Sequence, residues 1–287
     1  MGCEGTMSAG RANHGTNGAS HETGRARRDA TGPEGAVLAF NDLSFSRGER
    51  LVISGLTYQV RAGRLTCLVG RNGCGKSTLL GLAGGALRAR SGSVLLRGRE
   101  ISEMSERERS RELAILAQAH AAPAMRVREL VALGRYPYRG DGDAASDEAA
   151  VERALALTGL TDLSDAWVDR LSGGQRQRAH IALAIAQETT ALLMDEPTTY
   201  LDAAGCHEVL RLARGLARGG GTVLAVVHDL DLALRYADEL AVMDGGRIAC
   251  SGAPAAVLAT GALQDLFDVR IHPFEAEGET GYLLFPR

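Results

Sequence analysis

The chain has 287 residues, of which 45% are hydrophobic and 23% are charged, and its formal net charge is −3 at pH 7. This composition is typical of a globular protein with a buried core, and it gives no electrostatic reason to expect nucleic acid as a partner. No stretch approaches the roughly 20 apolar residues that cross a bilayer, and the five scattered cysteines indicate neither a disulfide framework nor a zinc site.

The N-terminal part differs in composition from the rest of the chain. Residues 1–34 are rich in Gly, Ser, Asn and Arg and carry almost no large apolar side chains, so we expect a disordered tail. Folded structure should begin near Ala36, with an antiparallel group of strands that continues through Val60. The core should begin at Leu65, because residues 65–69 form an apolar run typical of a buried parallel strand.

A glycine-rich segment follows this strand. It has the form G-x-x-x-x-G-K-[ST] of a phosphate-binding loop, and a helix that begins at Ser77 would direct its N-terminus at phosphate. Lys76 is the only lysine among the 32 basic residues, and its compact ammonium suits the β- and γ-phosphates better than a planar Arg fork. The Ser77 hydroxyl is expected to bind Mg²⁺. The candidate ATP-binding residues of the loop are Gly70, Arg71, Asn72, Gly73, Cys74, Gly75, Lys76, Ser77 and Thr78.

The next segments alternate between strands and helices. Residues 93–96 should form a strand, and Ser105 with Glu108 should form a capping box at the start of a short helix. Residues 114–117 should form a buried strand that ends at Gln118.

Between residues 119 and 168 the pattern becomes helical. Apolar residues recur at helical spacing over 127–133 and 147–157, and Ser146 is the expected N-cap of the second helix. A further helix is expected over 174–187.

Two continuous apolar strands, 191–194 and 222–227, flank a predicted helix over 203–217. This βα alternation predicts a parallel sheet covered on both faces. The first of these strands ends in Asp195, which should place a carboxylate near Mg²⁺, and Glu196 follows within reach of a water molecule in line with the γ-phosphate.

The run LSGGQ over residues 171–175 resembles the signature motif of ABC ATPases. Backbone dipoles at the N-terminus of the following helix present about half a positive charge. The resemblance implies that two copies associate head to tail and that this motif covers the γ-phosphate of ATP held by the other copy. The residues implied in this contact are Leu171, Ser172, Gly173, Gly174, Gln175 and Asp202.

Further elements match the family in order. Gln118 resembles the loop glutamine that senses the γ-phosphate and Mg²⁺, and His228 resembles the switch histidine. Residues 198–202 resemble the loop after the catalytic glutamate, although Tyr200 replaces a small residue of many relatives. The resemblance therefore implies ATP and Mg²⁺ as cofactors. It implies the catalytic residues Glu196, His228, Lys76 and Gln118 and the metal ligands Ser77, Gln118 and Asp195.

The residue that stacks on adenine is left open. The family usually has an aromatic residue there, and this chain has Arg47 at that position with Phe45 two residues earlier. Arg47 could stack through its planar guanidinium, or Phe45 could substitute.

The resemblance implies an α/β fold, a P-loop NTPase with a RecA-like core, an antiparallel β subdomain and an inserted α-helical subdomain. The expected boundaries are 35–270 for the ATPase domain, with the helical subdomain at about 119–172, and 271–287 for a C-terminal extension. The segments that look like the ATPase subunits of iron-chelate, heme and cobalamin importers are Leu133–Pro137, Leu171–Ala179 and Pro197–Asp202.

This finer resemblance implies a peripheral subunit on the cytoplasmic face of the membrane. Its implied partners are a second copy of the chain, an integral membrane permease and, indirectly, an extracytoplasmic substrate-binding protein. The alternatives are a soluble ABC ATPase without a transporter, the ATPase subunit of an exporter, and a nucleotide-binding module without hydrolysis. Lys76, Asp195, Glu196 and His228 argue against the last of these. The transported compound is not readable from the residues.

Overall fold

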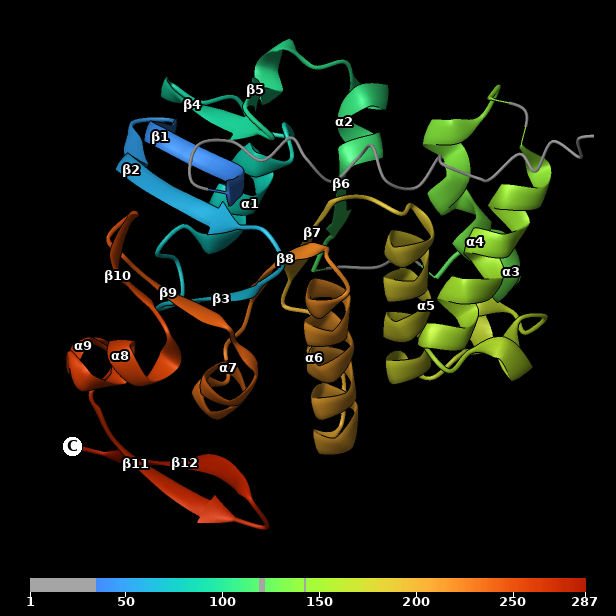
Figure 1. Ribbon diagram of the computed structural model, residues 1–287. Coiled ribbons are helices and arrows are strands. Elements are labelled where there is room, and N and C mark those ends of the chain that lie inside the picture. The colour runs from blue at the N-terminus through green and yellow to red at the C-terminus, as the bar shows by residue number, and fades with distance from the viewer. Residues whose placement is uncertain (1–34, 119–121, 142) are drawn as a thin grey trace, which may run out of the picture. The chain divides into compact units, whose positions relative to one another are not determined.

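The computed structural model describes residues 35–118, 122–141 and 143–287. The predicted tail, residues 1–34, lies outside the described residues. The described part of the chain forms two sheets, a two-stranded hairpin and helices that flank the sheets (Figure 1). Within it, no helix is both long enough and apolar enough to cross a membrane.

The larger sheet has six strands in the order β10-β9-β3-β8-β7-β6. Its strands are β3 (Leu65–Val69), β6 (Leu113–Leu116), β7 (Ala191–Asp195), β8 (Thr222–Val226), β9 (Glu239–Asp244) and β10 (Arg247–Gly252). Of these, β10 alone runs antiparallel to its neighbour, at one edge. The parallel arrangement brings the carboxyl ends of β3, β8, β7 and β6 to the same side of the sheet, where open α/β sheets bind their ligands.

The smaller sheet is antiparallel and has the order β2-β1-β4-β5. Its strands are β1 (Ala36–Arg47), β2 (Arg50–Arg61), β4 (Ser91–Leu96) and β5 (Arg99–Glu100). The predicted architecture, a parallel core with an antiparallel β part and an inserted helical part, is confirmed.

Helices connect the strands and cover the larger sheet. They are α1 (Lys76–Ala83), α2 (Glu106–Glu112), α3 (Val127–Ala132), α4 (Ala144–Leu157), α5 (Gly173–Ala186), α6 (Ala203–Arg218), α7 (Leu230–Tyr236), α8 (Pro254–Ala259) and α9 (Ala262–Phe267). Strands β11 (Val269–Ala276) and β12 (Glu279–Pro286) form the C-terminal hairpin.

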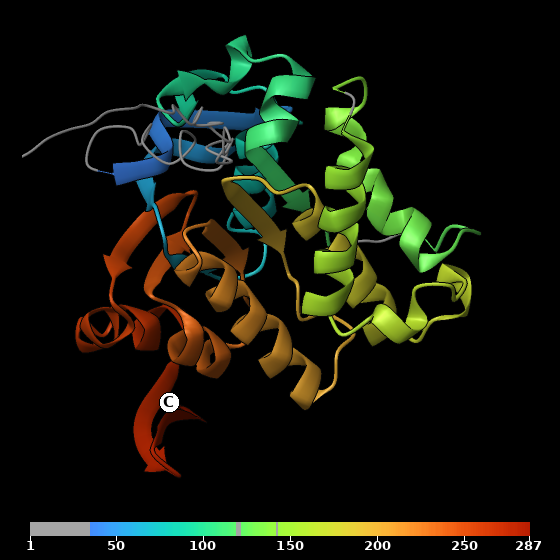
Figure 2. The same cartoon turned by 45° about the vertical axis from the view of Figure 1, so that its right-hand side comes forward.

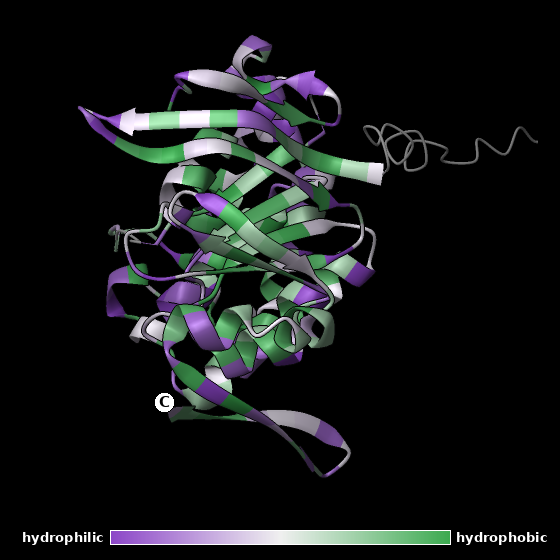
Figure 3. Cartoon of the chain, turned by 90° about the vertical axis from the view of Figure 1, so that its left-hand side faces the viewer, coloured by the Kyte–Doolittle hydropathy of each residue, from purple (hydrophilic) through white to green (hydrophobic). Residues whose placement is uncertain are grey.

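Alternate side chains of the parallel strands enter two different cores. On β3, Cys67 and Val69 point to a core shared with α5, α6 and α7, whereas Leu68 points to a core shared with α1 and the smaller sheet. Helices α6 and α7 accordingly lie on the opposite face of the larger sheet from the smaller sheet (Figures 1 and 2). Figure 3 shows the hydrophobic residues concentrated in the central strands, as expected for a sheet that is buried on both faces.

Helices α3, α4 and α5 share an apolar cluster of their own, which includes Leu130, Leu155 and Ala182. Helix α5 also contributes Ile181 and Ala184 to the core below the larger sheet. This helix therefore connects the helical part of the molecule to the parallel sheet. The numerical domain boundaries given above stay a prediction.

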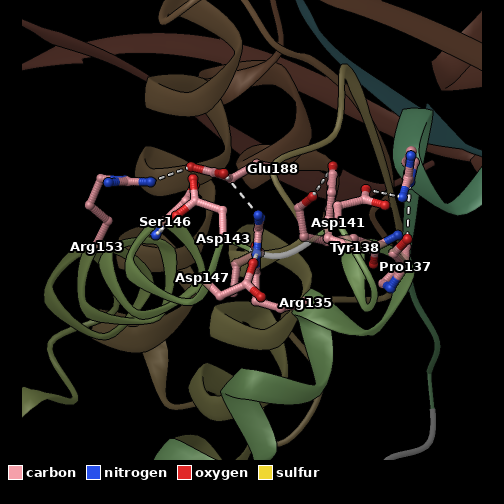
Figure 4. A network of polar contacts seen from close by, with 12 residues as sticks. Arg135, Pro137, Tyr138, Asp141, Asp143, Ser146, Asp147, Arg153 and Glu188 are labelled. Atoms are coloured by element: carbon pink, nitrogen blue, oxygen red, sulfur yellow. Dashed lines mark hydrogen bonds and ion pairs between the residues drawn. The ribbon is translucent and has the colours of Figure 1, made fainter.

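A polar network around the buried Arg135 ties these helices together (Figure 4). Arg135 lies in a 3-10 helix over Leu133–Tyr138. Its guanidinium donates hydrogen bonds to Asp147 on α4 at 2.7 Å, to the carbonyl of Ala186 at the end of α5 at 2.9 Å and to Glu188 at 3.0 Å. A buried guanidinium with three partners is satisfied, so the segment that carries it is fixed against both helices.

The expected N-cap and the expected start of helix α4 both need correction. Asp143, rather than Ser146, is the N-cap of α4, and its carboxylate accepts a hydrogen bond from the Ser146 backbone N–H at 3.0 Å. The helix therefore begins at Ala144. An aspartate at the N-cap satisfies a free N–H as well as a serine does and adds a favourable charge at the positive end of the helix.

Candidate active site

The loop between β3 and α1 is shaped by its glycines. A Cβ atom at Gly70 would collide with the carbonyl oxygen of Met243 and with Sγ of Cys74, so only glycine fits there. Gly75 is the N-cap of α1 with φ of 111°, and no side chain of the described residues caps this helix. The first N–H groups of α1 are therefore free of side-chain acceptors and point into the loop, which is the arrangement that binds phosphate.

Lys76 is the first residue of α1, and it is only 6% exposed. Its Nζ donates hydrogen bonds to the carbonyl oxygens of Gly70 at 2.7 Å and Arg71 at 3.1 Å. An ammonium has three N–H donors, so one remains after these two bonds. The loop thus holds a positive charge at its centre with capacity to bind an anion.

Ser77 and Asp195 meet at the carboxyl ends of β3 and β7. The Ser77 hydroxyl donates to Oδ1 of Asp195 at 3.2 Å. Burial raises the pKa of the Asp195 carboxyl, the hydrogen bond from Ser77 opposes this shift, and the nearby charge of Glu196 adds to it. Two hard oxygen donors side by side next to a phosphate loop fit Mg²⁺, which commonly takes one or two protein oxygens and completes its shell with phosphate and water.

Glu196 is held in a strained backbone conformation, with φ of 52°, and its side chain is 17% exposed. Its carboxylate accepts a hydrogen bond from Nε2 of Gln118 at 2.7 Å and lies 2.5 Å from Nε2 of His228. The Thr199 hydroxyl also donates to it, at 3.4 Å. A strained backbone conformation at a residue whose side chain is held by several partners is typical of a functional position.

Strand order explains how residues so far apart in the sequence meet. Gln118 follows β6, Glu196 follows β7 and His228 follows β8, and these three strands are neighbours in the sheet. The carboxyl ends of neighbouring parallel strands lie together, so the three side chains converge at one edge.

The converging residues open onto a cleft of about 870 Å³. Its lining includes Arg47, Arg50, Val52, Asn72, Gly73, Gly75, Lys76, Ser77, Thr78, Gln118, Glu196 and His228. Of the two candidates for the adenine contact, Arg47 lines the cleft, whereas Phe45 packs against the core around the smaller sheet. The sequence analysis missed Arg50 and Val52. They lie on β2, close to Arg47 in the sequence but outside every motif, so no pattern marked them.

The signature run lies at the N-terminus of α5. Ser172 is the N-cap, and its hydroxyl accepts from the Gln175 backbone N–H at 3.2 Å while the Gln175 side chain accepts from the Ser172 N–H at 3.0 Å. Ser172 and Gly173 are exposed, and the neighbouring Tyr200 is 79% exposed with φ of 69°. Across the described ranges, no hydrogen bond joins residues 171–175 to the residues that line the cleft. In one copy of the chain, this end of α5 faces outward.

Asp202 is the N-cap of α6 and accepts a hydrogen bond from the Gly205 N–H at 2.8 Å. The chain thus uses this carboxylate as a helix cap, at an exposed position next to Tyr200.

Gln177 is a further residue that the sequence analysis missed. It is 3% exposed, and its Nε2 donates to the carbonyl of Pro197, directly after Glu196, at 2.9 Å. It therefore ties α5 to the loop that carries Glu196. A signal was present, because a polar side chain at 177 shares a helical face with the apolar Ile181 and Ala184.

Comparison with known proteins decides the family. The family described as ABC transporter matches residues 53–199. The chain belongs to the ABC transporter family. It is 43% identical over 243 residues to the achromobactin transport ATP-binding protein CbrD of Dickeya dadantii. This alignment covers 83% of this chain and 90% of the relative. It is 41% identical over 253 residues to the hemin import ATP-binding protein HmuV of Streptomyces coelicolor, which covers 88% of this chain and 90% of the relative.

A solved structure of a transporter classed as metal-chelate type, in an inward-facing conformation, contains a chain with the same fold. The TM-score is 0.76 at 26% identity, over 88% of this chain and 98% of that chain. The predicted membership of the group of siderophore and heme import ATP-binding subunits is confirmed.

Membership of the ABC transporter family establishes the general activity of the chain. The chain binds ATP and hydrolyses it to drive transport. ABC ATPase subunits of this kind work with transmembrane permease components in transporter complexes.

Proposed function

We propose that the chain energises the import of an iron chelate, a ferric siderophore or hemin, through a membrane permease. Two copies form the ATPase unit on the cytoplasmic face of the membrane, and an extracytoplasmic binding protein supplies the chelate to the permease. The named substrates of relatives support this proposal, since a ferric siderophore and hemin are both iron chelates.

The observation that carries the proposed chemistry is the fixed carboxylate of Glu196 beside the phosphate loop. Gln118 and His228 hold this carboxylate from two different strand ends. A carboxylate that is fixed in the same cleft as the phosphate loop is suited to take a proton from the attacking water. We therefore assign Glu196 as the general base.

The remaining roles follow from the same geometry. Lys76 and the N–H groups at the start of α1 stabilise the charge that develops on the transferred phosphate. Ser77 and Asp195 hold Mg²⁺, with the amide oxygen of Gln118 available as a further ligand, because only its nitrogen is bonded to Glu196. Bound Mg²⁺ supplies Lewis-acid neutralisation of phosphate charge.

The exposed end of α5 supports a pair of chains as the hydrolytic unit. The Ser172 oxygen accepts the cap hydrogen bond, so its hydroxyl proton is still available to an outside acceptor. The N–H groups of Gly173 and Gly174 lie in the first turn of the helix, where no intrahelical acceptor exists. An ATP bound in the cleft of a second copy provides the phosphate oxygens that these donors require.

Substitution of Glu196 tests the assigned base. We expect Glu196→Gln to bind ATP and to hydrolyse it about 10²–10⁴-fold more slowly, because removal of a general base has that effect. The measurement is phosphate release with nucleotide binding followed in parallel, and Glu103→Gln, at an exposed position, is the matched control. Retention of more than about a tenth of the wild-type rate would show that the base lies elsewhere.

Uptake by cells tests the proposed substrate. In a strain that lacks this chain, we expect the wild-type chain, but not Glu196→Gln, to restore uptake of iron supplied as a siderophore or as hemin. Cobalamin uptake serves as the comparison. Restoration of cobalamin uptake alone would contradict iron-chelate import and leave the ATPase assignment intact.

A further inference from the structure

A second cleft lies between α6, α7 and strand β12, apart from the residues of the active site. Its volume is about 660 Å³. The lining residues are Arg211, Arg214, Gly215, Arg218, Leu234, Arg235, Tyr236, Glu279, Thr280 and Tyr282. Four guanidinium groups and one carboxylate line this cleft, and Arg235 is also paired with Asp231, so the excess positive charge comes from the three arginines of α6. We call it the arginine cleft.

Three of the arginines come from one face of α6. Arg211, Arg214 and Arg218 follow one another at spacings of three and four residues, which places them in a row along the helix. Like charges at these spacings destabilise a helix. Among the residues that the structure describes, no carboxylate forms an ion pair with Arg211 or Arg218. The fold therefore carries an electrostatic cost here that a bound anion would remove.

Arg214 is incompletely satisfied. One of its terminal nitrogens donates to the carbonyl of Arg235 at 3.5 Å, which is a long contact. Its Nε is buried and has no hydrogen-bond partner. This guanidinium also lines the cleft, and its one long contact leaves terminal N–H donors available to a ligand there.

The far wall of the cleft is fixed in place. Arg235 on α7 donates to Asp231 at 3.0 Å, and the same carboxylate oxygen accepts from the Tyr282 N–H of β12 at 2.8 Å. Glu279 is 80% exposed and lies 4.0 Å from Arg235, so it neutralises little of the charge. The C-terminal hairpin is thus attached to α7, and the arginines of α6 face a wall that is already ordered.

We propose that the arginine cleft binds a small molecule that carries two or more linked phosphate groups. From Arg211 to Arg218 the helix rises about 10.5 Å, which is longer than one phosphate and matches a chain of two or three. Guanidinium forks bind phosphate oxygens in pairs, which suits such a chain. The volume lies within the range of about 300–1,000 Å³ for small-molecule sites, and the site is concave, unlike a flat docking face for a protein.

Calorimetric titration with sodium tripolyphosphate tests the proposal. The full-length chain carries Lys76→Ala, so that the phosphate loop does not dominate the signal. We expect one binding event that weakens as salt is raised. In the same background, Arg211→Gln with Arg218→Gln should weaken binding at least about tenfold, because each lost guanidinium contact with phosphate contributes on the order of that factor. The matched control is Arg90→Gln, an exposed arginine outside the cleft, which should leave affinity unchanged.

Both replaced arginines are exposed on α6, so the double variant should fold, and its circular dichroism spectrum should match that of the parent. A second variant, Arg211→Lys with Arg218→Lys, keeps the charges and removes the forks, and it should bind with intermediate affinity. Equal tripolyphosphate affinity in the parent and in the double glutamine variant would overturn the proposal. Tighter binding of citrate, or of an acidic peptide, than of tripolyphosphate would overturn it as well.

Discussion

We propose phosphate as the ligand of two helix N-termini in this chain, and these ends differ in how their free N–H groups are treated. Helix α1 begins at a left-handed glycine and has no side-chain cap, and its neighbour Lys76 is buried against loop carbonyls. Helix α5 begins with a complete capping box between Ser172 and Gln175 and stands exposed. Both ends carry the same partial positive charge.

The difference indicates when each end meets its ligand. An uncapped end at the bottom of a cleft pays for its free donors until phosphate arrives, so it is the site that recruits nucleotide. An exposed end that is capped by its own side chains is stable without a ligand, and it can wait for a second copy of the chain. We therefore propose that the capping chemistry of two helices separates recruitment of the nucleotide from closure by a second copy.

Removal of the buried ammonium should have the largest effect on the recruiting end. Lys76→Ala, and equally Lys76→Arg, should slow hydrolysis by about 10²–10³-fold, as loss of one charge-stabilising donor does elsewhere. Arginine should not rescue, because its planar fork is too large for a loop in which Gly70 and Gly75 leave no space for a Cβ. Phosphate release and ATP binding are the measurements.

The control is a measurement of folding. Among the described residues, the hydrogen bonds of the Lys76 ammonium go only to carbonyls of the loop, so its loss should not unfold the chain. Both variants should keep the circular dichroism spectrum of the wild-type chain. An Arg variant with wild-type turnover would show that the loop does not discriminate between the two cations.

Substitution of Ser172 should separate the cap from the ligand contact at the closing end. Ser172→Asp keeps a good N-cap, so stability should stay within about 0.5 kcal/mol of wild type. Hydrolysis should fall about 100-fold, because a carboxylate facing a triphosphate costs several kcal/mol in a closed interface, and every 1.4 kcal/mol is tenfold.

Ser172→Ala provides the complementary case. It loses the cap, which costs about 1 kcal/mol of stability, but it introduces no negative charge and should slow hydrolysis less than the aspartate does. ATP binding by one copy should be unchanged in both variants. If the aspartate variant hydrolysed ATP as fast as wild type, residues 171–175 would not face the triphosphate of a partner.

Local chemistry made much of this molecule predictable. The phosphate loop, the apolar strand before Gln118, the strand that ends in Asp195 and the capping box at Ser105 all depend on residues close together in sequence, and the structure has them in the expected elements. The misplaced cap of α4 shows the limit of such patterns. Asp143 and Ser146 are both good capping residues three positions apart, and sequence alone does not rank them.

Contacts between residues far apart in the sequence could not be predicted. Arg50 and Val52 reach the cleft from the smaller sheet, and Gln177 meets the Pro197 carbonyl only because α5 packs beneath the loop after β7. The arginine row on α6 reads in sequence as an ordinary solvated face, and only the fold of β12 over α7 makes it a cleft. Such sites depend on tertiary register, which short patterns do not encode.

Gln177 connects α5 to the loop that carries Glu196, and its loss should have a smaller effect. Gln177→Leu leaves the buried Pro197 carbonyl without its donor, which should cost roughly 1–3 kcal/mol of stability. Hydrolysis should slow severalfold, because the loop of Glu196 is no longer attached to α5. Denaturant unfolding and phosphate release measure the two effects.

Gln177→Glu sharpens this test. A carboxylate facing a carbonyl oxygen is repulsive, so this variant should be less stable than the leucine variant at pH 7 and should recover as the pH falls and the carboxyl is protonated. Equal stability of all three proteins would show that the hydrogen bond to Pro197 carries no energy.

The buried carboxylate of Asp195, next to the open end of α1, should lower the stability of the ligand-free chain, and this is the smallest effect that we expect. Burial raises the pKa of this carboxyl above its usual 3.8, so the folded chain holds the proton more tightly than the unfolded chain does. The stability that protonation provides is fully present below the usual pKa and is lost as the pH rises through the folded-state pKa. At pH 7 the wild-type chain bears the whole cost of the buried charge.

Asp195→Asn, whose amide oxygen can still accept from Ser77, should therefore melt at a higher temperature than wild type at pH 7 in the absence of nucleotide. The difference should shrink as the pH is lowered toward 4, while the exposed Asp162→Asn shows no such trend. A difference in melting temperature that stays constant across this range would mean that the charge at the end of β7 imposes no cost, and that the recruiting end is as stable without its ligand as the closing end.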